Sequence, residues 1–533
     1  MRKIFSKKNP ALFLISKIGK IFLMLAKLKT LTLIGLDGEE IEIEVDIHRG
    51  LPAFSIVGLA DAAIQESRER VRSAIKNSGF EFPRGKIVVN LAPADLKKHG
   101  PRFDVPIALG ILAASGQIIL PKNLAEKIFV GELAFTGELR PISGTLPTAA
   151  TAIKKKFTEI FLPAENAAEA AIIEKIDVRP AKNLLEICDH FCGQKIPIFE
   201  KKFLEKINFP ENSENDFCHV RGNENARRAL EIAAAGGHNI LMNGPPGSGK
   251  TMLAKSFATI LPKMEISEAL EITKIHSISG LTNEKNSIIS ARPFRTVHHT
   301  ASGIAIVGGG NPPRPGEISL AHRGVLFLDE FAEFSQKTLE VLRQPLEDGI
   351  VTISRASGSC NFPAKFILVA AMNPCPCGFL GDAEKDCTCS TFQISRYQNK
   401  ISGPLLDRID LHVQVPRIPF EKLAKIEPGE SSKKIRERVQ NARNFQLARF
   451  KNLRKKISCN AEMSSELVKK FCSIDAHSSD LLRTAMSQMN LSGRAFFRIL
   501  KLARTIADLA AAEKIEMPHI AEAIQYRERK NEN

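Results

Sequence analysis

The sequence predicts an α/β fold in which a parallel sheet carries a phosphate-binding loop. The mostly apolar residues 239–242 are typical of a buried strand, and the glycine-rich stretch 244–251 begins two residues later. Apolar residues at helical spacing begin at Met252. A second apolar run, 325–328, ends in two acids, as strands of ligand-binding parallel sheets do. The 533 residues, 44% of them hydrophobic, allow roughly three or four domains.

The stretch 244–251 has the pattern G-x-x-x-x-G-K-T. Its glycines let backbone N–H groups point at an anion, and the helix N-terminus adds partial positive charge. We expect Lys250 to reach the β- and γ-phosphates of ATP and Thr251 to hold Mg²⁺. A chance match in a glycine-rich turn is the alternative, and the flanking strand and helix count against it. The predicted cofactor-binding residues are Gly244, Gly247, Ser248, Gly249, Lys250, Thr251 and Asp329.

Asp329 and Glu330 supply the second half of the predicted site. Both follow a buried strand, at the edge where parallel sheets bind ligands. Asp329 would hold Mg²⁺ through water, together with Thr251. Glu330 would polarise the attacking water as a general base.

The net charge of +16 is concentrated in two segments. Residues 1–29 hold eight Lys or Arg and no acid, and residues 421–460 hold twelve against four acids. A nucleic-acid partner or a solvated helix face explains residues 421–460 equally well. No apolar run reaches the ~18 residues of a membrane span, and ten Cys in so long a chain do not indicate a secreted scaffold. We therefore expect a cytoplasmic protein.

Four of the cysteines form a cluster of two C-x-C pairs, Cys375 with Cys377 and Cys387 with Cys389. Four thiolates in a short loop fit a tetrahedral zinc ion. Four free thiols or a redox pair are the alternatives, because C-x-C is a less usual zinc spacing than C-x₂-C. We favour structural zinc.

Strand and helix signals alternate through residues 24–192 and predict an independent α/β domain. A hairpin is predicted by the turn sequence Asp37-Gly38, which follows one strand pattern and precedes a second in which acidic and aliphatic residues alternate. The predicted elements are strands over 30–36, 40–47 and 86–91 and helices over 61–78 and 104–115.

The remaining segments are distinguished by composition. Residues 1–23 are basic but lack the unbroken apolar core of a signal peptide, and we expect Met24 to be the true start. Residues 193–215 are polar with weak periodicity, which predicts a linker. Residues 221–235 predict a helix, and residues 430–526 predict a helical region.

Several stretches resemble the N-terminal domain of the Mg-chelatase-like ATPases called YifB or ComM. They are Val57-Gly-Leu, Glu66-Ser-Arg-Glu-Arg-Val-Arg, Asn90-Leu-Ala-Pro-Ala-Asp-Leu, Gly131-Glu-Leu and Gly137-Glu-Leu-Arg-Pro. The resemblance implies a fold similar to the Lon protease domain, of the ribosomal S5 domain 2-like type. Lon-type proteolysis uses a Ser–Lys pair, and the matching positions hold Gly100-Pro101-Arg102 and Leu146-Pro147. We expect no peptidase activity, and a domain that binds something or holds subunits together.

The resemblance extends into the ATPase half and implies further catalytic residues. Asn373, which follows the apolar run 366–371, matches the polar residue that senses the γ-phosphate in AAA+ ATPases. Arg408 matches an arginine finger given to a neighbouring subunit, with Arg396 as the alternative. Arg494, at the start of a long helix, matches a lid residue that contacts the γ-phosphate in its own chain. A structural salt bridge is the alternative for each arginine.

Two Gly- and Pro-rich stretches, 294–302 and 308–317, resemble an insert in the second helix of the ATPase module that faces the pore in hexameric relatives. His298 and His299 are adjacent, so on a strand they would point to opposite faces. We therefore favour phosphate or interface contacts over a metal site.

A β-hairpin is predicted by residues 349–355 and 361–369, which flank a short polar turn. It resembles the hairpin that precedes the sensor strand in DNA-translocating relatives. Arg355 at its tip is a candidate DNA contact.

The resemblance covers residues 24–526 and identifies the chain as a member of the YifB/ComM type of Mg-chelatase-like AAA+ ATPases. It implies a Lon-like N-terminal domain, a P-loop AAA+ core and a helical lid. A hexameric ATP-driven helicase acting on single-stranded or branched DNA is implied, in recombination or natural transformation. A Mg-chelatase subunit and a nucleotide-gated assembly factor with little turnover are the alternatives. The predicted divisions are 1–23, 24–192, 193–215, 216–420 with a Cys-rich loop over 375–389, and 421–533.

Overall fold

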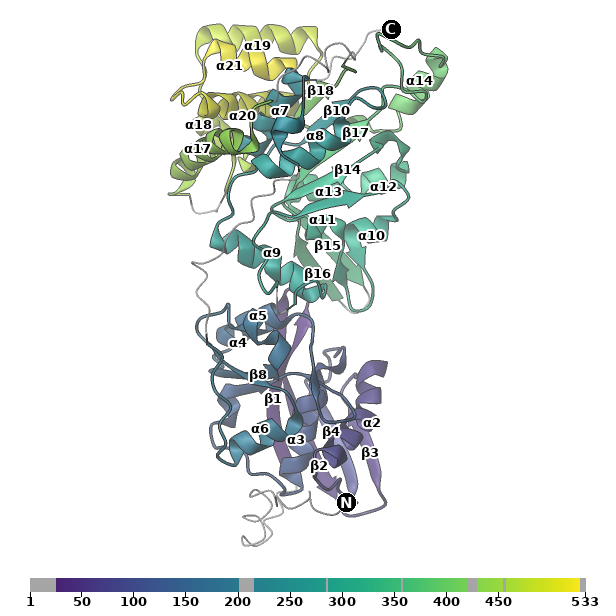
Figure 1. Cartoon of the computed structure of the whole chain (residues 1–533), viewed down its shortest axis with the longest axis vertical. Coiled ribbons are helices and arrows are strands. Elements are labelled where there is room, and N and C mark those ends of the chain that lie inside the picture. Colours follow the sequence, from purple (N-terminus) through teal and green to yellow (C-terminus); the bar gives the residue numbers. More distant parts are fainter. Residues whose placement is uncertain are drawn as a thin grey trace, which may run out of the picture.

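The computed structural model describes residues 25–200, 215–283, 286–355, 358–418, 429–453 and 457–527. The molecule is elongated, with the N-terminal part at one end, the core with the glycine loop next, and the C-terminal helices at the far end (Figure 1). The expected start at Met24 and most of the expected linker lie outside the described residues. Within the described residues, no helix is both long and apolar enough to cross a membrane.

The described N-terminal residues form two main sheets. The first contains, in spatial order, β1 (Leu25–Ile34), β2 (Asp37–His48), β4 (Lys86–Ala92) and β3 (Ala53–Val57). Only β3 and β4 pair in parallel among these described strands. The second, parallel sheet contains β5 (Lys127–Phe129), β8 (Glu159–Pro163) and β9 (Asp177–Ala181), and β6 (Glu132–Leu133) pairs with β7 (Leu139–Arg140). The helices are α2 (Ala62–Asn77), α3 (Asp104–Ala114), α4 (Thr145–Lys154), α5 (Ala167–Ala170) and α6 (Leu184–Phe191).

The hydrophobic pattern explains how this part packs. Every residue of α3 is buried, and an added Cβ on its Gly110 would lie 2.5 Å from Cγ2 of Val45 on β2. The predicted hairpin forms, but the predicted position of its turn is wrong by two residues. Ile34 pairs with Asp37, so the turn residues are Gly35 and Leu36. Gly35 has φ +61°, a conformation that glycine adopts without steric cost.

The core is built on a parallel sheet. In spatial order it contains β11 (Phe294–Val297), β14 (Val325–Leu328), β17 (Ile367–Met372), β10 (Ile240–Asn243) and β18 (Leu411–Gln414). The core helices are α7 (Glu224–Gly236), α8 (Lys250–Phe257), α9 (Ile266–Ile278), α10 (Gly303–Val307), α11 (Glu317–Leu320), α12 (Gln336–Glu340), α13 (Arg343–Asp348), α14 (Thr391–Gln398) and α15 (Gly403–Leu406). Because the strands are parallel, their carboxyl ends meet at one edge, as the sequence predicted.

Two segments of the core differ from the prediction. Residues 294–297 form edge strand β11 rather than part of an insert, and the prediction missed it because Arg295 and Thr296 interrupt the apolar run. Residues 361–369 divide between two strands, since β16 (Gly358–Pro363) ends at a proline after pairing with β15 (Ile350–Arg355). The insert itself forms a second small hairpin, from β12 (Gly308–Gly309) and β13 (Arg314–Pro315).

The C-terminal helices are α17 (Ser432–Phe450), α18 (Ser465–Phe471), α19 (Ala476–Gln488), α20 (Gly493–Leu509) and α21 (Met517–Gln525). An ion pair attaches them to the core: Nη1 of Arg498 lies 2.5 Å from Oδ1 of Asp410. Nδ1 of His238 lies 3.3 Å from the other oxygen. Burial would raise the pKa of Asp410, but Arg498 and His238 outweigh it and hold that pKa well below its usual range.

The N-terminal part contacts the core through a buried acid. Glu169 of α5 accepts hydrogen bonds from Oγ of Ser277 at 2.5 Å and Oγ1 of Thr282 at 3.0 Å. The backbone N–H of Gly144 donates to the Ser277 carbonyl at 3.0 Å. Burial raises the pKa of Glu169. These contacts link α4 and α5 to the C-terminal end of α9.

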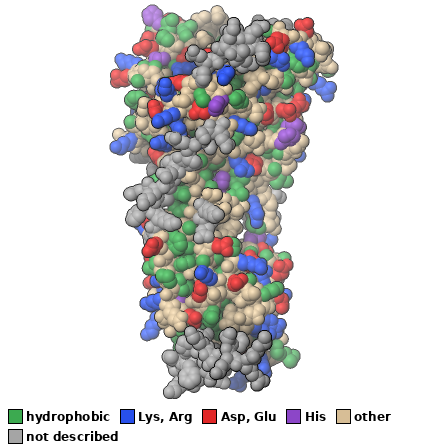
Figure 2. Space-filling model, viewed as in Figure 1, with side chains coloured by type: hydrophobic (Ala, Val, Ile, Leu, Met, Phe, Trp, Pro, Cys, Tyr) green, Lys and Arg blue, Asp and Glu red, His purple; other side chains and the backbone are tan. Residues whose placement is uncertain are grey.

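Basic and acidic side chains are interspersed over the face seen in Figure 2. Part of the positive charge of residues 421–460 is paired with acids of this chain. On α17, Arg438 pairs with Glu231 and Arg449 pairs with Asp508. The described basic residues of this segment also include exposed lysines, such as Lys433 and Lys434, beside these paired arginines.

Candidate active site

The glycine loop connects β10 to α8 and has the backbone that a phosphate site requires. Gly247 and Gly249 have φ +78° and +87°, which only glycine adopts readily. An added Cβ on Gly244 would lie 2.1 Å from the carbonyl oxygen of Val415, so the chain passes too close for a side chain. The strand, loop and helix predicted from the sequence are confirmed.

Lys250 lies folded into this loop and is 9% exposed. Its Nζ donates to the carbonyl oxygens of Gly244 at 2.6 Å and Pro245 at 2.8 Å. It also donates to Oδ1 of Asn373 at 3.2 Å, which joins the end of β17 to the loop. Burial lowers the pKa of Lys250 to about 8, and a bound phosphate would favour its charged form.

The hydroxyl and the carboxylate predicted to hold Mg²⁺ face each other. Oγ1 of Thr251, in the first turn of α8, lies 2.9 Å from Oδ2 of Asp329, directly after β14. Oxygen ligands of this kind, few in number and open to a nucleotide, suit Mg²⁺. The residues at this edge therefore fit a Mg²⁺–nucleotide complex.

Glu330 has a partner that the sequence analysis missed. The residue has φ +51°, a strained backbone for a non-glycine, and its side chain is 54% exposed. Its Oε2 lies 2.9 Å from Nδ1 of His299, which follows β11. The expectation that His298 and His299 diverge is wrong, because they lie beyond the strand with ring centroids 4.2 Å apart. Strand β11 was not predicted from the sequence, and without that strand the position of His299 beside Glu330 could not be foreseen.

Arg408 and Arg494 lie at the opposite edge of the sheet. Arg408 precedes β18, whose first residue pairs with Ile240, whereas the glycine loop follows the other end of β10. These four-residue strands separate the two edges by about 13 Å. Both arginines approach Glu347 of α13: Arg408 contacts it directly, and Nη2 of Arg494 lies 3.9 Å away. Arg494 thus lies away from the glycine loop of its own chain in this structure, and its contact with a nucleotide stays a prediction.

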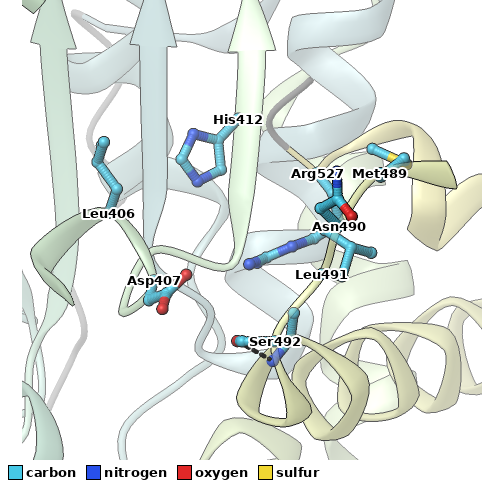
Figure 3. A pocket seen from close by; sticks show the side chains of 9 residues that line it. Leu406, Asp407, His412, Met489, Asn490, Leu491, Ser492 and Arg527 are labelled. Atoms are coloured by element: carbon cyan, nitrogen blue, oxygen red, sulfur yellow. Dashed lines mark hydrogen bonds between the residues drawn. The ribbon is translucent and has the colours of Figure 1, made fainter. Parts of the chain in front are cut away.

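Exposure distinguishes these two arginines. Arg408 is 9% exposed, and the Arg494 side chain is 64% exposed. Close by, a pocket lies between His412 on β18 and the turn from α19 to α20, with Asp407 and Asn490 on its walls (Figure 3). Burial lowers the pKa of His412 to about 4. The alternative finger, Arg396, is exposed on α14.

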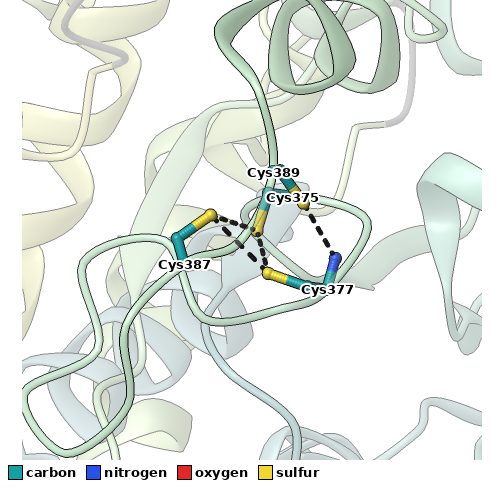
Figure 4. Close-up of side chains that lie close together, drawn as sticks. All are labelled: Cys375, Cys377, Cys387 and Cys389. Atoms are coloured by element: carbon teal, nitrogen blue, oxygen red, sulfur yellow. Dashed lines mark hydrogen bonds between the residues drawn. The ribbon is translucent and has the colours of Figure 1, made fainter.

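The four clustered cysteines point their sulfur atoms at one another (Figure 4). Sγ of Cys375 lies 3.4 Å from that of Cys377 and 3.6 Å from that of Cys387, and the ligand atoms of all four lie within 4.8 Å. Sulfurs around a tetrahedral zinc, with bonds of about 2.3 Å, would be about 3.8 Å apart. Backbone hydrogen bonds lower the pKa of Cys377 to about 5, whereas burial and the neighbouring thiols outweigh such bonds and raise the pKa values of Cys387 and Cys389, so it is the geometry of the sulfurs that supports a metal site. The cluster can therefore hold a metal ion.

A glycine loop with its lysine, a Thr–Asp pair and a glutamate at the edge of a parallel sheet define a P-loop ATPase, and the helical C-terminal region places it in the AAA+ class. The sequence profiles of three families match the chain: "Magnesium chelatase, subunit ChlI" over residues 216–423, "Subunit ChlI of Mg-chelatase" over 43–166 and "Magnesium chelatase, subunit ChlI C-terminal" over 429–527.

Three relatives show how far the similarity extends. Competence protein ComM of Haemophilus influenzae is 44% identical over 92% of this chain and 95% of its own length. Protein YifB of Escherichia coli is 43% identical over 93% and 95%. Magnesium-chelatase subunit ChlI of Euglena gracilis is 25% identical over 51% and 79%. The chain belongs to the ComM/YifB family of Mg-chelatase-like AAA+ ATPases.

Substitution Glu330→Gln should abolish hydrolysis while preserving nucleotide binding. The amide keeps the size of the side chain but cannot accept a proton from water, so kcat should fall by about 10²- to 10⁴-fold. Steady-state phosphate release and titration with a fluorescent ATP analogue would measure the two effects separately. Unchanged turnover would refute Glu330 as the base.

Proposed function

We propose that the protein hydrolyses Mg²⁺–ATP at the carboxyl edge of the core sheet. The meeting of Lys250, Thr251, Asp329 and Asn373 at that edge carries the proposal. Lys250 and the loop N–H groups would bind the phosphates, and Thr251 and Asp329 would hold the metal. Bound Mg²⁺ supplies neutralisation of phosphate charge. Glu330 would accept a proton from the attacking water, and Asn373 would help to place that water.

We propose further that a neighbouring copy completes the site. Arg408 and Arg494 lie together, yet about a strand's length from the glycine loop of their own chain. A cation delivered in trans stabilises the charge on the transferring phosphate. A closed ring, such as the hexamer implied by the family resemblance, lets every subunit present one edge to the next. Release of Arg408 from Glu347 would accompany this contact.

Two inactive variants should restore activity when they are combined. Arg494→Ala removes an exposed side chain, so the subunit should fold and keep its own glycine loop, whereas Glu330→Gln keeps its arginines. Each alone should lose at least about tenfold in turnover, and the co-expressed mixture should regain a clear fraction. Glu330→Gln with Lys250→Ala is the control, because both defects fall in the same half-site and activity should stay low. A mixture as inactive as this control would contradict the shared site.

We propose DNA as the substrate of the motor. The support is the similarity to a protein named for competence and the presence of two small hairpins in the core. The hairpins pack together, since an added Cβ on Gly308 would lie 3.0 Å from Cδ1 of Ile353. Arg314, on strand β13 of one hairpin, is exposed. The side chain of Arg355, on the other hairpin, lies outside the described part of the structure. Metal insertion is less favoured, because the ChlI relative is less similar and matches half of the chain.

DNA should stimulate ATP hydrolysis at low salt, and the stimulation should decline as salt rises because phosphate contacts release counterions. The measurement is ATPase rate with single-stranded and branched DNA. Arg314→Ala should weaken stimulation without changing the DNA-free rate. Arg483→Ala, at an exposed position of α19 in the lid, is the matched control. A rate that no DNA changes would contradict the DNA motor and favour a metal-insertion or assembly role.

We propose that the four clustered cysteines hold one structural zinc ion, in a reducing cytoplasm. Protein purified without chelators should contain about one zinc per chain, because four thiolates in this geometry form a closed tetrahedral site. Cys387→Ser should lower the content, and Cys192→Ser, at an exposed cysteine elsewhere, should not. Elemental analysis measures both. Absence of zinc in the unaltered protein would refute the assignment.

A further inference from the structure

The cysteine cluster lies against the glycine loop. Cys375 follows Asn373 by two residues, and the chain then turns at Gly378, which has φ +86°. An added Cβ on Gly378 would lie 2.6 Å from Cδ and 2.8 Å from Cγ of Pro246. Pro246 is part of the glycine loop itself. The turn between the two cysteine pairs therefore packs directly on the proline ring.

A second contact joins the same two loops. Nη2 of Arg417, beyond β18, donates to the carbonyl oxygen of Pro246 at 3.1 Å. Nη1 of this guanidinium lies 3.4 Å from Oε2 of Glu384, within the cysteine loop. The group also lies over the ring of Phe379, 5.9 Å from its centroid. Arg417 thus bridges residues 375–389 and the phosphate loop.

Residues 375–389 have no regular structure of their own to hold this arrangement. All of them are described, and none lies in a helix or a strand. Their fixed points are the end of β17 at one side, the start of α14 at the other, and the sulfur cluster between them. A metal bound by four thiolates would fold such a segment, because the binding free energy of the metal becomes folding free energy.

We propose that residues 375–389, closed by their metal, form a brace that holds the glycine loop in its nucleotide-binding conformation. The inference rests on the proposed zinc and ATP sites. It adds that the zinc site controls the affinity of the ATP site for nucleotide. The cradle binds phosphate well only if its N–H groups are already aligned, since ordering a flexible loop reduces affinity. Gly378 and Arg417 fix Pro246, and the same loop follows Asn373, which contacts Lys250. Loss of the metal should therefore weaken nucleotide binding.

Two glycines of the brace provide a matched pair of variants. Gly378 and Gly381 both have positive φ, at +86° and +76°, so alanine strains the backbone similarly at either position. Only Gly378 has a neighbour within 4 Å that an added Cβ would meet closely, because nothing lies near Gly381. The probe is a fluorescent ATP analogue with Mg²⁺, titrated into the full chain, and zinc content is measured on the same samples.

Gly378→Ala should keep its zinc and bind the analogue at least about tenfold more weakly, and Gly381→Ala should stay within about twofold of the unaltered protein. Arg417→Gln should weaken binding in the same direction. Chelation of the zinc should lower the affinity of the unaltered protein, and added zinc should restore it. Equal affinities for the two alanine variants would overturn the brace.

The same measurements separate this inference from the proposals on which it depends. If the unaltered protein contains no zinc while Gly378→Ala still binds weakly, the zinc assignment is overturned and the packing contact alone is the brace. If the unaltered protein binds no Mg²⁺–nucleotide analogue, the ATP site is overturned and the brace with it. A stoichiometric zinc content together with affinity that is independent of zinc overturns only the control of one site by the other.

Discussion

Parallel hydrogen bonding between β10, β17 and β14 is the constraint on which the site depends. The register pairs Asn243 with Met372 and Leu328 with Ala370, so the residues that follow these strands emerge at one edge. This pairing lets Lys250 reach Asn373, and it lets Thr251 face Asp329. Asp329 and Asn373 are far in sequence from each other and from the adjacent Lys250 and Thr251. The sheet therefore converts three separate strand ends into one compact polar surface at the start of α8.

The same parallel arrangement places the arginines apart from that surface. Each strand is short, yet it separates the phosphate edge from the edge that carries Arg408 and the start of α20. Asp410 attaches the C-terminal helices to this second edge through Arg498 and His238, deep inside the protein. One subunit therefore presents a nucleotide-binding edge and an arginine-bearing edge that do not meet. In the proposed shared site, a neighbouring copy would bring its arginine-bearing edge to this nucleotide-binding edge.

Much of the site follows from local patterns in the sequence. The glycine loop, the acids after β14 and the two cysteine pairs each lie in a short segment. Their chemistry can be predicted from the local sequence without knowledge of the fold. The partners of Glu330 and Arg408 were not predictable in this way, because His299 and Glu347 come from elements whose spatial neighbours depend on strand order. Edge strand β11 was missed since Arg295 and Thr296 give it no apolar run. The resemblance of Arg494 to a lid residue did not indicate at which edge of the sheet its side chain lies.

The dependence of turnover on assembly tests the central claim most directly. Steady-state ATPase rate per chain would be measured over a wide range of protein concentration, with oligomeric state determined by light scattering at each point. If neighbouring subunits complete the site, turnover per chain should rise with the assembled fraction and then reach a plateau. Turnover per chain that stays constant while the protein passes from monomer to oligomer would contradict a shared site.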